Sequence, residues 1–417
     1  MSLWAFRFIL WYLCILLVQP QNRFFFLHPL HIADIAVMGG VGLHVLSAMQ
    51  DGRPLIRFGP ATITALLLMF FSFISLYAGA MQTSSYWNAN IDLIFKNALV
   101  LIMIEAMATT VERVWAVQAT MLFATLWWVK GGLRIAAAGS TYAGDRIHGP
   151  AVSLIENPNG FAYLMTVMIP LYLYFYQKSP YKYVRWAFLG LAVASVYIVL
   201  QTGSRTGLIA LILVGAFLLP KYGAQYKKAI LIGGVAIFIL SSSIGSMNME
   251  RYRTIWTSIQ GFLATDYEDK DPSQMDQDEQ SAWERKMKNL HTWRLIKEYP
   301  VFGVGLQPND SLVMEKYYYA SGQVHNEILY AGKQMGFIGM GLYLSFVLGT
   351  FIRGWVIQRR ARYTWPALAD MGWTFKMQAM VIMIGGFFSP IPWNPITLTL
   401  AGSVSALILN LREHEGL

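Results

Sequence analysis

The chain has 417 residues, of which 55% are hydrophobic and only 13% charged, about half the charged share of an ordinary soluble domain. This composition argues against a water-soluble protein, and the single cysteine, Cys14, excludes a disulfide framework and a cysteine-rich metal site. The net charge of +9 predicts no nucleic-acid partner, because Lys and Arg collect in the cytoplasmic loops of membrane proteins.

Apolar stretches of the length that crosses a bilayer as a helix recur along the whole chain. They predict an all-α polytopic membrane protein with about 12 transmembrane helices, in contact with membrane lipids. The predicted spans are 3–19, 31–48, 61–80, 90–108, 111–130, 159–177, 183–201, 205–220, 228–246, 326–352, 374–389 and 394–411. The first span contains Arg7 followed by an apolar run, and no small-residue cleavage site comes after it, so we interpret it as an uncleaved signal anchor.

Basic residues are unequally divided between the two sides of these spans. With the N-terminus inside, the predicted cytoplasmic loops hold Arg53, Arg57, Lys178, Lys182, Arg185, Lys221, Lys227, Lys228, Arg353, Arg359, Arg360 and Arg362. The short outer loops hold only Arg23, Arg134, Arg146 and Arg205. This bias predicts that both termini are cytoplasmic, and it makes the outer arginines candidates for function.

One large polar loop interrupts the spans and lies on the outer side. The chain accordingly divides into residues 1–246 with transmembrane helices 1–9, a helical loop or cap at 247–325, and residues 326–417 with helices 10–12, all in one integrated membrane domain. Within the loop we predict a short helix over 249–263 and an amphipathic helix over 281–300. The apolar face of the second helix is predicted to contain Trp283, Met287, Leu290, Trp293 or Arg294, and Ile296.

The same loop carries an acidic run at 266–284. It contains two Asp-x-Asp sequences, at 269–271 and 276–278, of the kind that binds a metal–nucleotide in many glycosyltransferases. Because any acidic loop produces this spacing by chance and charge-dense tracts rarely fold, we interpret the run as a solvated segment and predict no metal site.

Three arginines accompany polar or glycine-rich segments on the outer side. Arg146 lies in 144–150 (GDRIHGP), Arg205 in the turn 203–207 (GSRTG) that opens a span, and Arg285 in the loop helix. A guanidinium donates two parallel hydrogen bonds and keeps its charge, and a helix N-terminus favours anions. We interpret the three as one site for a lipid diphosphate; the alternative is that each reaches a lipid headgroup separately.

His325 lies where the polar loop meets the next span. A neutral imidazole can take a proton from a hydroxyl near neutral pH, so His325 is a candidate general base. The alternative is a structural or solvated histidine, like the others in the chain. No hydrolase or ATP-binding motif of the Gly-x-Ser-x-Gly or Walker type occurs.

The order of three short motifs, together with the spans and the loop between the ninth and tenth, resembles the O-antigen ligase and polymerase family of bacterial inner membranes. The motifs are the turn 203–208 (GSRTGL), Arg285 with a helix ending in 299–305 (YPVFGVG), and His325-Asn326 with nine residues before Gly336 and Gly339. The His-Asn motif is most similar to that of the O-antigen ligases.

This resemblance implies a GT-C-like membrane glycosyltransferase of lipopolysaccharide biosynthesis. It would transfer a glycan from undecaprenyl diphosphate to a sugar hydroxyl of lipid A-core oligosaccharide on the periplasmic side of the inner membrane. By likeness, His325 would be catalytic and Arg205 and Arg285 would contact the diphosphate; Arg146 is added from topology, and Ser204 and Asn326 are expected to support them. We expect an inverting transfer without cofactor or metal, because cationic side chains can stabilise the leaving diphosphate.

Three other functions remain open at this stage. A polymerase of the same family would use a second lipid-linked glycan as acceptor, and a protein O-glycosyltransferase would use a peptide. A lipid or polysaccharide transporter would explain the many spans and the charged residues Asp92, Lys96 and Glu105 in 90–108. Transporters usually show two related halves, which we do not find, so a structural ion-pair site is the favoured interpretation of these charges.

Overall fold

The structure is a computed structural model of the chain. It describes residues 2–22, 24–82, 89–139, 146–150, 156–223, 277–387 and 393–415, and the single residues 227, 231, 235, 252 and 275. This part of the chain is nearly all-helical and contains 13 α-helices. They are α1 (Ser2–Val18), α2 (Ile32–Asp51), α3 (Pro60–Ala78), α4 (Ala89–Met107), α5 (Val111–Ala137), α6 (Pro158–Lys178), α7 (Lys182–Gln201), α8 (Arg205–Tyr222), α12 (Gln277–Glu298), α13 (Asp310–Lys316), α14 (Glu327–Arg360), α15 (Pro366–Gly386) and α16 (Pro395–Glu415).

Every predicted span except 228–246 overlaps one of these helices. The span 228–246 and the predicted helix 249–263 fall almost entirely outside the described residues. Local sequence explains several of the helix boundaries, since a proline occupies the first turn of α3, α6 and α15. N–H groups in the first turn have no partner within the helix, so a proline costs no hydrogen bond there.

Among the described residues, five helices are long and apolar enough to cross a membrane, namely α2, α3, α7, α14 and the Pro395–Glu413 part of α16. This number is smaller than the predicted count of crossings, because helices such as α4, with Asp92, Lys96 and Glu105, are too polar to qualify. A helix enclosed by other helices needs no continuous apolar surface. The described helices therefore define a membrane protein without fixing the number of its crossings.

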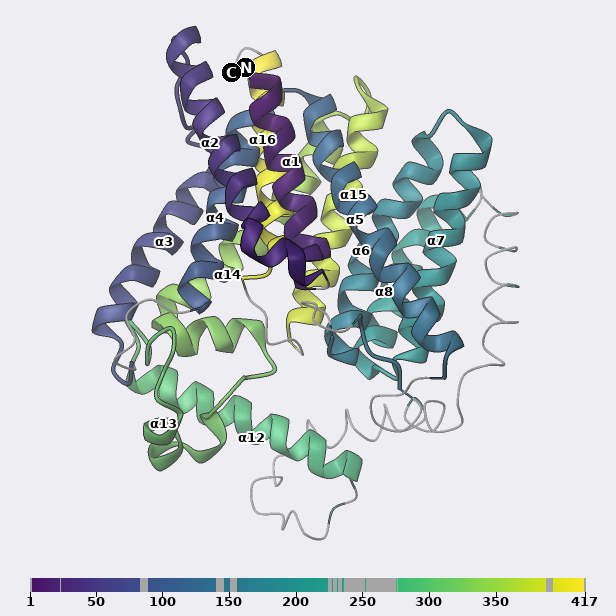
Figure 1. The fold of residues 1–417 in the computed structure, drawn as a ribbon. Helices are drawn as coiled ribbons and strands as arrows, with labels where there is room; N and C mark the ends of the chain where they lie inside the picture. Colours follow the sequence, from purple (N-terminus) through teal and green to yellow (C-terminus); the bar gives the residue numbers. More distant parts are fainter. Residues whose placement is uncertain are drawn as a thin grey trace.

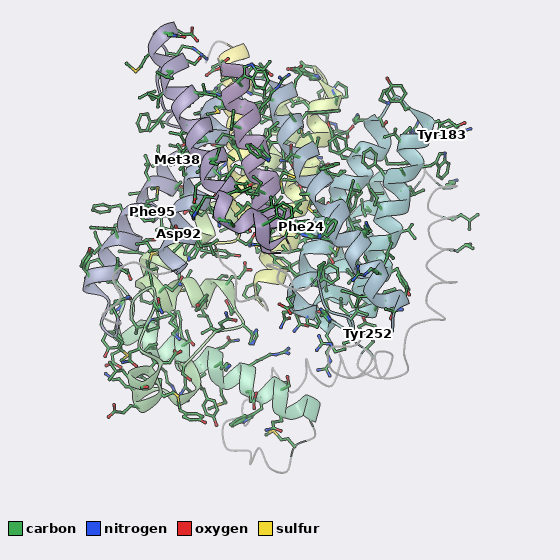
Figure 2. All side chains as sticks on the ribbon, in the orientation of Figure 1. Phe24, Met38, Asp92, Phe95, Tyr183 and Tyr252 are labelled. Carbon is green, nitrogen blue, oxygen red and sulfur yellow. The ribbon has the colours of Figure 1, made fainter. Side chains whose placement is uncertain are left out.

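The outside of the bundle carries large apolar and aromatic side chains. Phe24 is 49% exposed, Met38 72% and Tyr183 88%, and all three project from the bundle surface in Figure 2. Exposure of so many large apolar groups is unusual in a water-soluble monomer; it suits helices that contact lipid.

Helix α16 lies in the middle of the bundle, in contact with α3, α4, α5, α14 and α15, and α6, α7 and α8 form a group beside it (Figure 1). Both termini lie at one end of the bundle, which we call the terminal end. Helices α12 and α13 lie across the opposite end, which we call the α12 end.

Ion pairs join helix ends at the terminal end. Lys178 at the end of α6 and Lys221 at the end of α8 both contact Asp370 of α15, at 2.7 and 3.0 Å. Arg57 pairs with Glu413 of α16 at 2.6 Å. These cations belong to the loops that the sequence predicts to be cytoplasmic.

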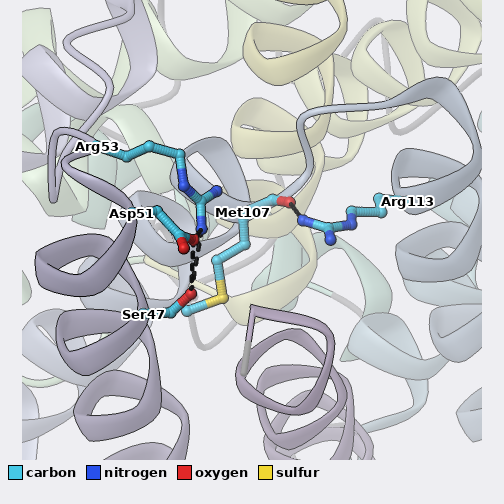
Figure 3. Close-up of polar contacts among 5 residues, drawn as sticks. All are labelled: Ser47, Asp51, Arg53, Met107 and Arg113. Carbon is cyan, nitrogen blue, oxygen red and sulfur yellow. Dashed lines mark hydrogen bonds and ion pairs between the residues drawn. The ribbon is translucent and has the colours of Figure 1, made fainter.

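Two further arginines of this end are drawn in Figure 3. Arg53 pairs with the exposed Asp51, which also accepts a hydrogen bond from Ser47 at 3.3 Å. Arg113 at the start of α5 donates to the carbonyl oxygen of Met107 at 2.8 Å, the last residue of α4. The first group fixes the C-terminal end of α2, and the second contact joins the start of α5 to the end of α4.

The charged residues of α4 have partners within the bundle. Lys96 lies 2.9 Å from Asp92 and 3.9 Å from Asp34 of α2, and Figure 2 shows Asp92 on the side of the bundle beside Phe95. Glu105 is fully buried and accepts the Thr62 N–H at 3.1 Å. These contacts agree with the interpretation of a structural polar site.

Candidate active site

The turn between α7 and α8, residues 202–207, is fixed by glycine conformation and by a side-chain cap. Gly203 has a φ of +59°, which glycine adopts without strain. Ser204 is 1% exposed, and its Oγ accepts the Gly207 N–H at 3.2 Å, which caps α8. A Cβ on Gly207 would lie 2.7 Å from Ala162 Cβ of α6. The half-buried Arg205 is thereby held at the first position of α8.

Arg146 lies against the same turn. Its Nε donates to the carbonyl oxygen of Thr202 at 2.9 Å, and a terminal nitrogen donates to Asn159 Oδ1 at the start of α6 at 3.0 Å. The next residue, Ile147, donates its N–H to Gln201 at 3.1 Å. Two of the motifs singled out in the sequence therefore meet in space.

Asn326 is the N-cap of α14. It is 7% exposed, and its Oδ1 accepts the N–H groups of Ile328 and Leu329, both at 3.1 Å. His325 comes immediately before it and is half-buried. Asn326 therefore fixes the start of α14 directly after His325.

Ten residues into α14 the helix is interrupted at Gly336, whose φ is +61°. A Cβ there would lie 2.2 Å from the carbonyl oxygen of Pro300. The same oxygen accepts the Phe337 N–H at 2.7 Å. The glycine therefore lets the segment that follows α12 bind directly to the interrupted backbone of α14.

Neighbouring glycines complete this contact. Gly303 and Gly305 have φ values of +64° and +110°, and Val304 between them donates its N–H to the carbonyl oxygen of Lys333 at 2.9 Å. A Cβ on Gly79, at the end of α3, would lie 2.5 Å from the Cα of Gly305. We call residues 299–305 together with residues 333–339 the glycine junction. The close approach of the two backbones there explains the glycines at 303 and 305 and those at 336 and 339.

The segment before His325 is anchored by a buried lysine. Lys333 is 2% exposed, and its Nζ donates to the carbonyl oxygens of Ala320 and Gly322 at 2.7 and 2.9 Å. Asp310 accepts the Gly322 N–H at 3.0 Å. Since Lys333 belongs to the glycine junction, the position of His325 depends on that junction.

Helix α12 packs on the same segment through aromatic rings. Trp283 contacts Tyr319 with ring centroids 5.3 Å apart and planes at 88°, and His291 contacts Tyr319 at 5.2 Å. Leu295 and Ile296 are also buried. Residues of α12 that lie between these anchors, including Arg285, are thereby held near the start of α14.

The predicted apolar face of α12 was partly wrong. Trp293 is 38% exposed and Arg294 is also exposed, because the buried stripe passes through Thr292 and Leu295 instead. The helix also begins at Gln277, earlier than predicted, so the last part of the acidic run is helical.

His325 is neutral at physiological pH. Burial, followed by the positive charges of Arg285 and Lys288, lowers its pKa to about 4 from an ordinary value of about 6.5. Of these two cations, Arg285 is one of the residues singled out in the sequence. An imidazole without a proton can accept one.

The two groups of candidate residues lie at the same end of the bundle. The last residues of α6 and α8 meet Asp370 at the terminal end, so the starts of α6 and α8, with Arg146 and Arg205, lie at the α12 end. There α12 contacts the beginning of α14. Tyr252, labelled in Figure 2, donates from its hydroxyl to Leu200 at 2.7 Å, which brings a residue of the large loop to the end of α7.

The described residues contain no group of three or more His, Cys, Asp and Glu side chains that could hold a metal ion. The Asp-x-Asp at 269–271, and Asp276 of the second, lie outside the described residues.

Two buried charged residues of this region were missed in the sequence. Lys333 anchors the segment before His325, and Glu327, fully buried, accepts a hydrogen bond from the hydroxyl of Tyr343. Both could have been noticed as ionisable residues inside the apolar span 326–352. Lys288 could not, because its effect depends on how α12 is placed over α14.

The fold and these residues define a polytopic helical membrane protein that holds a neutral histidine beside basic side chains at one end. Residues 190–344 match the profile of the family described as O-antigen ligase. Residues 4–180, which include Arg146, match one described as a family of unknown function (DUF5935). No curated protein matches the chain.

The first match contains the 202–207 turn, Arg285, His325 and the glycine junction. This likeness over residues 190–344 confirms the resemblance drawn from these motifs. At a coarse level the match supports a ligase or polymerase function of a membrane glycosyltransferase-like enzyme.

Proposed function

We propose that this protein is an O-antigen ligase. It transfers a glycan from undecaprenyl diphosphate to a sugar hydroxyl of lipid A-core oligosaccharide, at the periplasmic face of the inner membrane. The observation that carries the proposal is a half-buried His325 whose pKa is lowered by burial and by the charges of Arg285 and Lys288. It lies in a segment that packs against α12, at the end of the bundle where α6 and α8 begin.

His325 is the general base of the proposed reaction. Its imidazole takes the proton of the acceptor hydroxyl while that oxygen bonds to the anomeric carbon of the donor. The bond from this carbon to the diphosphate oxygen breaks on the opposite face, so the configuration is inverted. The energy is already present in the glycosyl–diphosphate bond, and no nucleotide is required.

The arginines hold the diphosphate and stabilise its growing charge. Arg205 combines a guanidinium with the N-terminus of α8, a position that favours anions. Arg285 approaches from α12, and Arg146 fixes the turn to α6. Cationic donors fixed in a partly dehydrated site can supply the stabilisation that a metal ion supplies elsewhere, which makes a metal-independent transfer the expected result.

Donor binding also adjusts the base. Without substrate, Arg285 and Lys288 help to lower the pKa of His325 to about 4. A bound diphosphate offsets their positive charge, so the pKa of His325 rises and its imidazole becomes a stronger base only when the donor is present. This arrangement limits proton abstraction to the loaded site.

The test is a gel-shift assay with purified protein in detergent, undecaprenyl-diphosphate-linked glycan and lipopolysaccharide that lacks O-antigen. We expect slower-migrating lipopolysaccharide, also in the presence of EDTA. His325→Ala should lower the rate by about 10²–10⁴-fold, whereas His31→Ala, which removes an exposed histidine of another segment, should keep it.

Other outcomes would contradict the proposal. A loss of less than about threefold in folded His325→Ala would exclude the general-base role, since such a base contributes far more. Lengthening of the lipid-linked glycan with unshifted lipopolysaccharide would identify a polymerase. If neither substrate changes with folded protein, a transport function becomes the better explanation.

A further inference from the structure

A second polar site lies at the terminal end, far from His325. A cavity of about 630 Å³ opens between the end of α8, the end of α14 and the first turns of α15. Along α14, at about 1.5 Å per residue, Arg359 lies roughly 45–50 Å from the start of the helix. The cavity is therefore separate from the candidate active site.

Basic side chains dominate the lining. Lys221, Arg359, Arg362 and Lys376 all line the cavity, together with the carboxylate of Asp370. That carboxylate is shared between Lys221 at 3.0 Å and Lys178 at 2.7 Å. The described lining therefore carries a clear excess of positive charge, which suits an anion with more than one charge.

Two tryptophans place these cations at an aromatic boundary. The Arg359 guanidinium lies 4.0 Å from the ring centroid of Trp355, and Lys221 Nζ lies 4.1 Å from that of Trp373. Tryptophan is enriched at the interface between lipid tails and headgroups. The exposed Trp355 with Arg359 over its ring is therefore a pair of the kind found at that interface, whereas Trp373 is buried.

One wall of the cavity is apolar and exposed. Phe217 of α8 is 49% exposed and Trp355 of α14 is 40% exposed, and both line the cavity. A ligand that fits must offer anionic groups to the cations and an apolar part to this wall. A soluble anion meets only the first requirement.

We propose that this cavity binds the headgroup of an anionic phospholipid with two phosphodiester groups, as in cardiolipin. The volume and the four cations match two phosphates better than one, and the exposed apolar wall accepts the first segments of the acyl chains. Basic pockets between transmembrane helices recognise such headgroups elsewhere. The bound lipid would connect α8, α14 and α15.

The test uses full-length protein, delipidated in a zwitterionic detergent, with cardiolipin, phosphatidylglycerol and inorganic diphosphate added separately. Native mass spectrometry counts the bound molecules. We expect one saturable cardiolipin per chain, and binding at least about tenfold weaker in Arg359→Gln/Lys376→Gln, because each cation near a lipid phosphate contributes about 1 kcal/mol. The matched control, Arg53→Gln/Lys182→Gln, removes two cations of the same end outside the cavity and should change binding less than about twofold.

Three results would overturn the proposal. If the cavity variant bound cardiolipin as tightly as the wild type, the cavity would not be the cardiolipin site. If phosphatidylglycerol bound as tightly as cardiolipin, the site would not require two phosphates. If inorganic diphosphate bound as tightly as cardiolipin, the cavity would be a site for soluble anions and not for a lipid. If the double variant does not fold, Arg362→Gln, which changes one exposed residue of the turn after α14, provides the same comparison with a smaller expected loss.

Discussion

The two ends of the bundle are held together in different ways. At the α12 end, the glycine junction brings backbone against backbone, with the Pro300 carbonyl oxygen accepting the Phe337 N–H at 2.7 Å. At the terminal end, α14 and α15 also pack closely, since a Cβ on Gly354 or Gly372 would lie within 2.8 Å of the other's carbonyl oxygen, but long charged side chains such as the Lys178–Asp370 pair add flexible contacts between helix ends. Backbone contacts fix distances, whereas ion pairs tolerate movement.

This difference agrees with the roles proposed for the two ends. A general base must be held at hydrogen-bond distance from the proton that it removes, and His325 is tied through Asn326 and Lys333 to the rigid junction. A lipid headgroup is flexible and can be bound by flexible side chains. Four variants test the contrast, from the largest expected effect to the smallest.

Gly336→Ala should have the largest effect on stability. The new Cβ would lie 2.2 Å from Pro300 O at a φ of +61°, and the combined cost of the left-handed conformation and the overpacking is about 2–5 kcal/mol. Thermal unfolding in detergent measures it. The matched control is Gly341→Ala in the same helix, where a Cβ meets nothing within 4 Å; equal losses in both variants would show that the junction is not rigid.

Lys333→Met should reduce activity more than an ordinary lysine substitution. It removes the two hydrogen bonds that hold Ala320 and Gly322, so His325 loses its exact support and kcat should fall about tenfold or more. Lys96→Met, which breaks a pair with side chains 40% exposed, should cost less than about 1 kcal/mol and leave kcat unchanged. An unchanged kcat in Lys333→Met would show that the position of His325 does not depend on the glycine junction.

The pH dependence of transfer should report the charge around His325. With the pKa lowered to about 4, the histidine of the free enzyme gains a proton only near that pH, so kcat/KM should fall there and not near 6.5. Donor binding raises the pKa, so the acid limb of kcat should lie at higher pH than that of kcat/KM.

Lys288→Gln tests the cause of this shift. Removing one of the two cations that lower the pKa should move the acid limb of kcat/KM upward by a modest amount, because burial is the larger cause. Lys297→Gln, at an exposed position of the same helix, is the control. If the acid limb of kcat/KM in the wild type lay at about pH 6.5, the pKa of His325 would not be lowered by its surroundings.

Asp51→Asn should have the smallest effect. Asp51 is exposed and pairs with Arg53 at the terminal end, and exposed pairs of this kind contribute little because water and salt screen them. The unfolding temperature should remain within experimental error at low and at high salt. If Asp51→Asn lowered the unfolding temperature as much as Gly336→Ala, the proposed difference in rigidity between the two ends would be wrong.

Much of the fold could be predicted from local pattern. Apolar runs of bilayer length located most of the helices, and the amphipathic stretch at 281–300 located α12, because hydrophobic periodicity and length are local properties. The start of α12 and the exposure of Trp293 could not be predicted, since both depend on which neighbour covers the helix.

The candidate residues could be named from the sequence, whereas their arrangement could not. Charge bias grouped Arg146, Arg205 and Arg285 on one side, and the motif with His325 completed the set. The contact of Pro300 with Gly336 and the effect of Lys288 on His325 depend on tertiary packing between distant segments, and no local sequence signal specifies them.

The interruption of α14 also has an evolutionary consequence. The backbone carbonyl oxygen of residue 300 occupies the space of a side chain at Gly336, and every residue type carries that oxygen. Among relatives, the glycine at 336 should therefore be retained even where residue 300 varies. A sequence lineage that lost this glycine would have had to rebuild the support of its histidine by other means.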